Sequence, residues 1–125
     1  MYAFELDKPQ KLDNWLIFPN TTLSDLNMND CNDTINGICH DTKNVQECIN
    51  ICKNSTECDG GYFLETPLKN YCVPLRTTPW LKADIQPYYE FRRKDIYPIM
   101  KDFSSKVFIN TENHPYPPNN ANCIY

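Results

Sequence analysis

Four cysteines in a short internal segment constrain the fold of this chain more than any other feature. The chain holds seven cysteines in 125 residues, and four of them fall within one segment: Cys48, Cys52, Cys58 and Cys72. The first two are spaced as neighbours on one helix face, and the others flank a hairpin-like stretch, which predicts a helix stapled to a β-hairpin. Because disulfides persist in oxidising compartments, we expect a structural or binding module outside the reducing cytosol.

The helix is expected to run from about Val45 to Lys53. Asn44 is a favourable N-cap, and Glu47 three residues later completes a capping-box pattern. Apolar positions at i, i+3, i+4 and i+7 form one stripe along this helix: Val45, Cys48, Ile49 and Cys52. Both helical cysteines are therefore expected to face the same neighbouring element.

A hairpin is expected directly after the helix. Residues 59–61 (Asp-Gly-Gly) should break the chain, residues 62–64 should form a short strand, and residues 66–70 should turn it back into a partner strand at 71–73. Residues 15–18 predict a short strand or an extended segment, and residues 106–109 predict another strand. The Asn-, Asp- and Thr-rich stretch 20–36 is expected to be surface loop.

These elements predict one domain over residues 1–125, with a core helix–hairpin module at about 38–75. The expected fold class is a small disulfide-rich α+β domain, in which one main helix packs on a short antiparallel sheet with long ordered loops. Ten prolines and only three glycines are consistent with much irregular backbone.

The four clustered cysteines allow three pairings, and the sequence alone does not choose among them. The preferred pairing joins Cys52 to Cys58, closing the turn between helix and strand, and Cys48 to Cys72, tying the helix to the hairpin. Zinc is disfavoured because Cys58 and Cys72 follow singly rather than as a second ligand pair. No base or oxyanion site marks a nucleophilic cysteine. We therefore expect no enzyme activity, no metal and no cofactor.

The segment from about residue 38 to 75 resembles the PAN/apple family, in which a helix carrying two cysteines is stapled to a central hairpin. The four clustered cysteines match that pattern, as does the stretch Gly60-Gly61-Tyr62-Phe63. The resemblance implies a module that binds protein or carbohydrate and is not an enzyme. Similar cysteine patterns appear in virion membrane proteins of large DNA viruses, so a viral surface protein is the expected source.

Three cysteines remain outside the cluster: Cys31, Cys39 and Cys123. A bond between Cys31 and Cys39 would span the Asn36-Gly37 turn signal, whereas a bond between Cys39 and Cys123 would tie the tail to the core. Either choice leaves one thiol, which is buried, free or paired with another chain. A disulfide-linked or complex subunit is therefore one of the expected arrangements.

Two further sets of residues are candidate surface sites. Glycosylation sequons begin at Asn20, Asn32 and Asn54. An aromatic and basic set is a candidate contact patch for a glycan, a lipid headgroup or a protein: Trp80, Tyr88, Tyr89, Phe91, Arg92 and Arg93. The favoured alternative is that these aromatics fill the core while the basic side chains are solvated. His40 and His114 are expected to be surface or loop residues.

Charge and hydropathy narrow the class of partner. A net charge of −4 argues against a general nucleic-acid binder. No apolar run approaches the roughly 20 residues of a membrane-spanning helix, so any anchor is expected to lie outside this chain. We expect an extracellular or virion-surface binding module that contacts protein or glycan, such as an envelope ectodomain that acts when a virus enters a cell. The alternative is a secreted inhibitor or toxin-like effector acting on a host enzyme or receptor.

Overall fold

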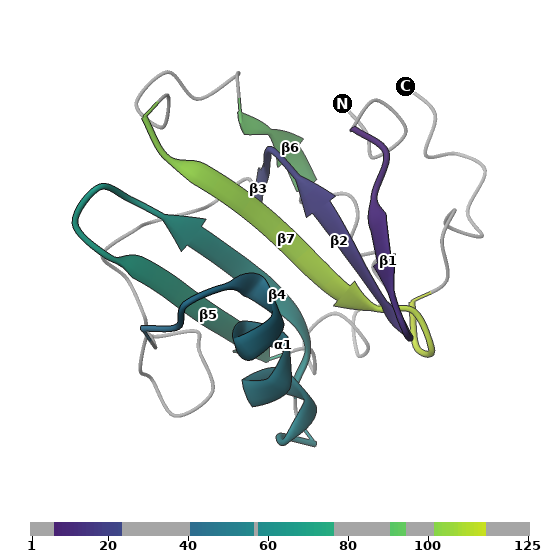
Figure 1. Ribbon diagram of the computed structural model, residues 1–125. Coiled ribbons are helices and arrows are strands. Elements are labelled where there is room, and N and C mark those ends of the chain that lie inside the picture. The colour runs from purple at the N-terminus through teal and green to yellow at the C-terminus, as the bar shows by residue number, and fades with distance from the viewer. Residues whose placement is uncertain (1–6, 24–40, 57, 77–90, 95–101, 115–125) are drawn as a thin grey trace.

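The computed structural model describes residues 7–23, 41–56, 58–76, 91–94 and 102–114, and Figure 1 shows their arrangement. One helix and seven strands are present in these ranges: β1 (Gln10–Leu12), β2 (Trp15–Pro19), β3 (Thr21–Leu23), α1 (Val45–Lys53), β4 (Cys58–Glu65), β5 (Asn70–Arg76), β6 (Phe91–Arg93) and β7 (Ser104–Asn110). The protein is a small disulfide-rich α+β domain, as the sequence predicts.

A five-stranded antiparallel sheet has the order β1-β2-β7-β4-β5. β7, from the C-terminal part of the chain, lies between β2 and β4 and pairs with both. In this register Ile17 lies opposite Phe108, and Phe108 lies opposite Gly61. The sheet is therefore held together by contacts between residues that are far apart in sequence.

Helix α1 has the bounds that its capping and periodicity predict. The Asn44 side chain accepts a hydrogen bond from the Glu47 backbone N–H at 3.0 Å, and Glu47 in turn accepts one from the Lys43 backbone N–H at 2.8 Å. These bonds satisfy amide groups that have no partner within the first helical turn. The buried side chains on α1 are Cys48, Ile49 and Cys52.

Both faces of the sheet bury apolar side chains. On one face, α1 packs against a cluster that includes Trp15, Ile17, Phe63 and Phe108. On the other face Phe18 contacts the ring of Phe91 at 5.2 Å between centroids, which brings the two-stranded β3–β6 ribbon against the sheet. Figure 1 shows α1 in front of β4 and β5, and β3 and β6 behind β2. The interior strand β4, which is paired on both sides, is buried along almost its whole length for this reason.

Two local predictions are wrong. Residues 59–61 do not break the chain but belong to β4, where the register shifts between Cys58 and Gly60. The start of the predicted surface loop 20–36 is instead strand β3, and its Thr21 and Thr22 are buried. Their hydroxyls donate to the backbone oxygens of Pro19 and Leu23, both at 2.8 Å, which allows these polar side chains to lie in the interior.

Candidate binding groove

Two disulfides attach α1 to the β4–β5 hairpin. Cys48 is bonded to Cys72 and Cys52 to Cys58, with Cα–Cα separations of 5.4 and 5.3 Å. These two bonds match the preferred pairing. The other three cysteines, Cys31, Cys39 and Cys123, lie outside the described residues.

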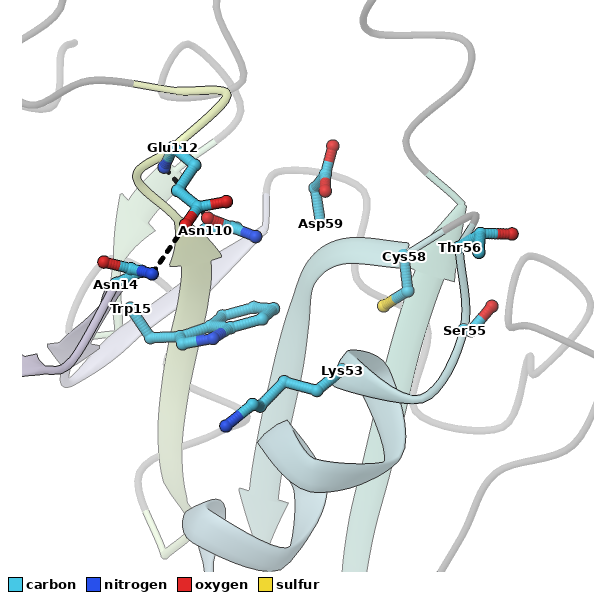
Figure 2. Close-up of a pocket in the computed structure, with 9 residues that line it drawn as sticks. All are labelled: Asn14, Trp15, Lys53, Ser55, Thr56, Cys58, Asp59, Asn110 and Glu112. Carbon is cyan, nitrogen blue, oxygen red and sulfur yellow. Dashed lines mark hydrogen bonds between the residues drawn. The ribbon is translucent and has the colours of Figure 1, made fainter.

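A groove of about 320 Å³ opens where the end of α1 approaches the ends of β2 and β7 (Figure 2). Three separate parts of the chain line it: Asn14 and Trp15; Lys53, Ser55, Thr56, Cys58 and Asp59; and Asn110 and Glu112. The lining is mostly polar, with two amides, two hydroxyls, one ammonium group and two carboxylates. Trp15 contributes little exposed area, since only 4% of this residue is accessible.

Hydrogen bonds hold one wall of the groove in place. The Asn14 side-chain amide donates to Glu112 Oε1 at 2.6 Å, a bond drawn in Figure 2. The backbone oxygen of Asn14 accepts from both the N–H and the hydroxyl of Thr111, at 2.7 and 2.8 Å. Glu112 also donates its backbone N–H to Asn110 Oδ1 at 2.9 Å. The β1–β2 turn and the turn after β7 are thus fixed to each other.

A buried histidine contacts Asp59, one of the groove residues. His114 is only 5% exposed, and its Nε2 lies 3.7 Å from Asp59 Oδ2. Asn113 donates a hydrogen bond to the other carboxylate oxygen of Asp59 at 3.1 Å. Burial lowers the pKa of His114 because desolvation disfavours the imidazolium, while the Asp59 carboxylate opposes this effect. His114 is a loop residue after β7, as expected, but its side chain lies in the interior rather than on the surface.

The groove suits recognition of a polar ligand. Preoriented carboxylates and amides accept and donate hydrogen bonds, and a ligand that meets them loses little free energy to ordering of the protein. Within the described ranges, no three histidine, cysteine or acidic side chains are grouped as metal ligands.

Two of the three predicted sequons lie on described surface positions. Asn20 is exposed at the β2–β3 turn, with φ 51°, and its side-chain amide donates to Asp7 Oδ2 at 3.3 Å. Asn54 is exposed at the C-terminal cap of α1. Asn32 lies outside the described residues.

The predicted aromatic–basic patch is only partly described. Phe91 is completely buried against Phe18, so it supplies core area rather than an exposed contact. Arg93 is exposed at the end of β6, and Arg92 lies in the same strand. The rest of the patch, Trp80, Tyr88 and Tyr89, lies outside the described residues.

Sequence reasoning misses the groove. Apart from Ser55 and Thr56, which belong to the Asn54 sequon, its polar residues fall in no motif, and its walls meet only because β7 lies between β2 and β4. The one signal in the sequence is that two groove residues directly follow clustered cysteines: Lys53 follows Cys52, and Asp59 follows Cys58.

Comparison with protein-family models, with curated proteins and with solved structures finds no match to this chain. Across the described part of the chain, no helix is long and apolar enough to cross a membrane. The two disulfides fit an oxidising setting.

Proposed function

We propose that this chain is a non-enzymatic binding module of an extracellular or virion surface, which contacts a protein or glycan partner through the groove between α1 and β7. The observation that carries the proposal is a polar groove whose walls are fixed before any ligand arrives. The Cys52–Cys58 bond fixes one wall, and the hydrogen bonds among Asn14, Thr111 and Glu112 fix the other. Preorganisation of this kind favours binding because less conformational entropy is lost.

The helix–hairpin arrangement adds support from the sequence. A helix joined by two disulfides to a hairpin is the arrangement that the PAN/apple resemblance implies, and we extend the proposal to a PAN/apple-like module on that basis. The seven cysteines are an odd number, so a disulfide-linked partner subunit is part of the proposal.

Blocking the groove tests the proposal. The labelled oxidised protein is applied to a panel of cultured cells, and bound protein is measured by flow cytometry before and after the cells are treated with glycosidases or with trypsin. Thr56→Arg places a long side chain at the exposed rim of the groove, and Gln46→Arg makes the same change in the exposed first turn of α1. We expect Thr56→Arg to weaken binding at least about tenfold and Gln46→Arg to leave it unchanged.

Each treatment reports one class of partner. Loss of binding after glycosidase treatment identifies a glycan, and loss after trypsin alone identifies a protein. Equal binding by the two arginine variants would place the contact outside the groove, and no binding to any cell would overturn the proposal.

The tip of the β4–β5 hairpin favours a second candidate, a secreted inhibitor or toxin-like effector. Leu68 is 96% exposed in a turn that is ordered by Thr66, whose hydroxyl donates to Lys69 O at 2.6 Å and accepts from Lys69 N–H at 3.1 Å. A rigid tip with an apolar side chain can enter a pocket of an enzyme. Inhibition of one member of a protease panel that is lost in Leu68→Asp would support this candidate, and no inhibition across the panel would contradict it.

A further inference from the structure

The two disulfides differ in their access to the groove. Cys48, Cys52 and Cys72 are completely buried, whereas Cys58 retains 4% of its surface and lines the groove. In Figure 2 the Cys58 sulfur points toward the side on which Trp15 and Lys53 lie. Because thiol–disulfide exchange requires a thiolate to reach one sulfur of the bond, the groove offers a route to the Cys52–Cys58 bond that the Cys48–Cys72 bond does not have.

The two bonds also close loops of different length. Cys52 and Cys58 are separated by 6 positions, and Cys48 and Cys72 by 24. The entropy of closing a loop in the unfolded chain grows with the logarithm of loop length. The fourfold ratio of loop lengths therefore means that the Cys52–Cys58 bond raises the folding equilibrium constant about eightfold less than the Cys48–Cys72 bond does. Opening the shorter loop therefore removes less of the free energy of unfolding.

We propose that Cys58 is a thiol-exchange site, at which a thiol that enters the groove opens the Cys52–Cys58 bond while the Cys48–Cys72 bond stays intact. The thiolate sulfur of the incoming molecule bonds to Sγ of Cys58, and the Sγ–Sγ bond between Cys58 and Cys52 breaks. The electron pair of that bond leaves with Cys52, which takes up the proton that the incoming thiol lost. A second thiol then releases Cys58 and leaves as a disulfide with the first.

Exchange at Cys58 alters one wall of the groove without unfolding the domain. Lys53, Ser55 and Thr56 lie between or beside the two cysteines and line the groove. Opening the bond frees this short segment from the start of β4, while Cys48–Cys72 still ties α1 to β5. The side chain of Ile49 also remains packed on the core with Phe63 and Phe108. The proposal of an exchange site does not depend on which partner the groove binds.

Peptide mapping tests the proposal directly. The native, oxidised full chain is exposed briefly to reduced glutathione, iodoacetamide is added to trap new thiols, and mass spectrometry follows all seven cysteines. We expect Cys52 and Cys58 to react faster than Cys48 and Cys72, because only Cys58 can be reached from the groove. The trapped intermediate should carry glutathione on Cys58 and the alkyl group on Cys52.

Two tryptophan variants separate access through the groove from general unfolding. Thr56→Trp fills the rim of the groove and should slow the opening of Cys52–Cys58, whereas Gln46→Trp on the exposed first turn of α1 should not. Equal rates for the two disulfides, glutathione attached to Cys52 instead of Cys58, or resistance of the Cys52–Cys58 bond until the protein unfolds would each overturn the proposal. Circular dichroism of the partly reduced protein should retain the native spectrum.

Discussion

Gly61 illustrates how a single residue permits the packing of the central strands. A β-carbon at this position would clash with Val73 O and lie 2.9 Å from Phe108 Cζ. The Phe108 side chain lies across Gly61 on the face that α1 covers, so the glycine leaves the room that this ring occupies. Absence of a side chain, rather than a need for a special backbone angle, explains the glycine here.

Gly61→Ala should therefore destabilise the fold. Backbone oxygen and an interior aromatic ring both restrict the new methyl group, so we expect a loss of about 1–3 kcal/mol in the free energy of unfolding. Urea denaturation followed by tryptophan fluorescence measures this loss. Thr66 lies in the β4–β5 turn and is not buried. Thr66→Ala therefore serves as the comparison variant, with a milder and local effect. Wild-type stability in Gly61→Ala would contradict the packing described for Phe108.

His114 shows how burial at one residue makes stability depend on pH. Burial lowers its pKa in the folded protein below the ordinary value of 6.5, so the unfolded chain binds a proton more readily. Between the folded and the unfolded pKa, added protons bind mainly to the unfolded chain. The free energy of unfolding therefore rises as pH rises. The contribution of the neutral imidazole is thus complete above about pH 7 and is lost progressively as pH falls through 6.5 toward the folded pKa.

Acidification from pH 7.5 to 5.5 should accordingly lower the free energy of unfolding more in the wild type than in His114→Gln, which cannot take up this proton. Denaturant titrations at several pH values give the two slopes. The chain holds a second histidine, so both proteins are measured in a His40→Gln background. Parallel pH profiles for the wild type and His114→Gln would show that burial of His114 does not shift its titration.

At the scale of the element, α1 is stabilised by local bonds at its start and by burial along one stripe. Asn44 accepts from the Glu47 N–H in the first turn, and Glu47 accepts from the Lys43 N–H just before the helix. Asn54 ends the helix with hydrogen bonds from its N–H to Asn50 O and Ile51 O, both at 3.3 Å. A helix of 9 residues is too short to be stable in isolation, so its packing on the sheet and its two disulfides complete the stabilisation.

Asn44→Ala should cost about 1 kcal/mol of unfolding free energy because the Glu47 N–H loses its acceptor. Asn44→Asp should retain most of the stability, since a carboxylate accepts the same bond. Thermal unfolding by circular dichroism compares the two variants. Equal destabilisation by alanine and aspartate would mean that the cap bond contributes nothing.

Strand β4 begins earlier than predicted, because it includes Gly60 and Gly61. Two consecutive glycines usually interrupt a strand, and their flexibility favours a turn. Here β5 and β7 pair with β4 on both sides and include Gly60 and Gly61 in the ladder. The gain from pairing on two sides outweighs the local preference, and the irregularity is confined to the register shift before Gly60.

At the scale of the whole molecule, covalent links compensate for a small core. A chain of 125 residues buries only about two-thirds of its unfolded surface, and each disulfide adds roughly 2–4 kcal/mol. The two bonds are placed where α1, the only helix in the described ranges, meets the hairpin. Their loss should thus loosen the contact between α1 and the sheet first.

Full reduction should lower the melting temperature by at least about 10 °C. Thiol titration of the unreduced protein in denaturant complements this measurement. With four of the seven cysteines bonded to one another, no more than three thiols should react, and a monomer should show an odd number. Four or more reactive thiols would contradict the disulfide framework, and none would indicate that two chains are linked.

Features that depend on residues close together in the chain are predictable from the sequence. The bounds of α1 follow from its cap and its 3.6-residue period, and the turn before β5 follows from Thr66, Pro67 and Asn70. The α+β class also follows from these elements, whereas the choice among the three cysteine pairings comes from the structure. Such features are accessible because the interactions that stabilise them lie within one or two turns of chain.

Contacts between distant segments are visible in the three-dimensional structure and not in the sequence. The strand pattern of residues 106–109 fits any neighbour with an apolar face, and pairing with both β2 and β4 is selected by long-range burial. That placement brings Asn110 and Glu112 beside Trp15 and the end of α1, and it buries His114 against Asp59. The groove and its thiol-accessible edge at Cys58 thus arise from packing between distant segments, because no local period or cap specifies which strand becomes the neighbour of which.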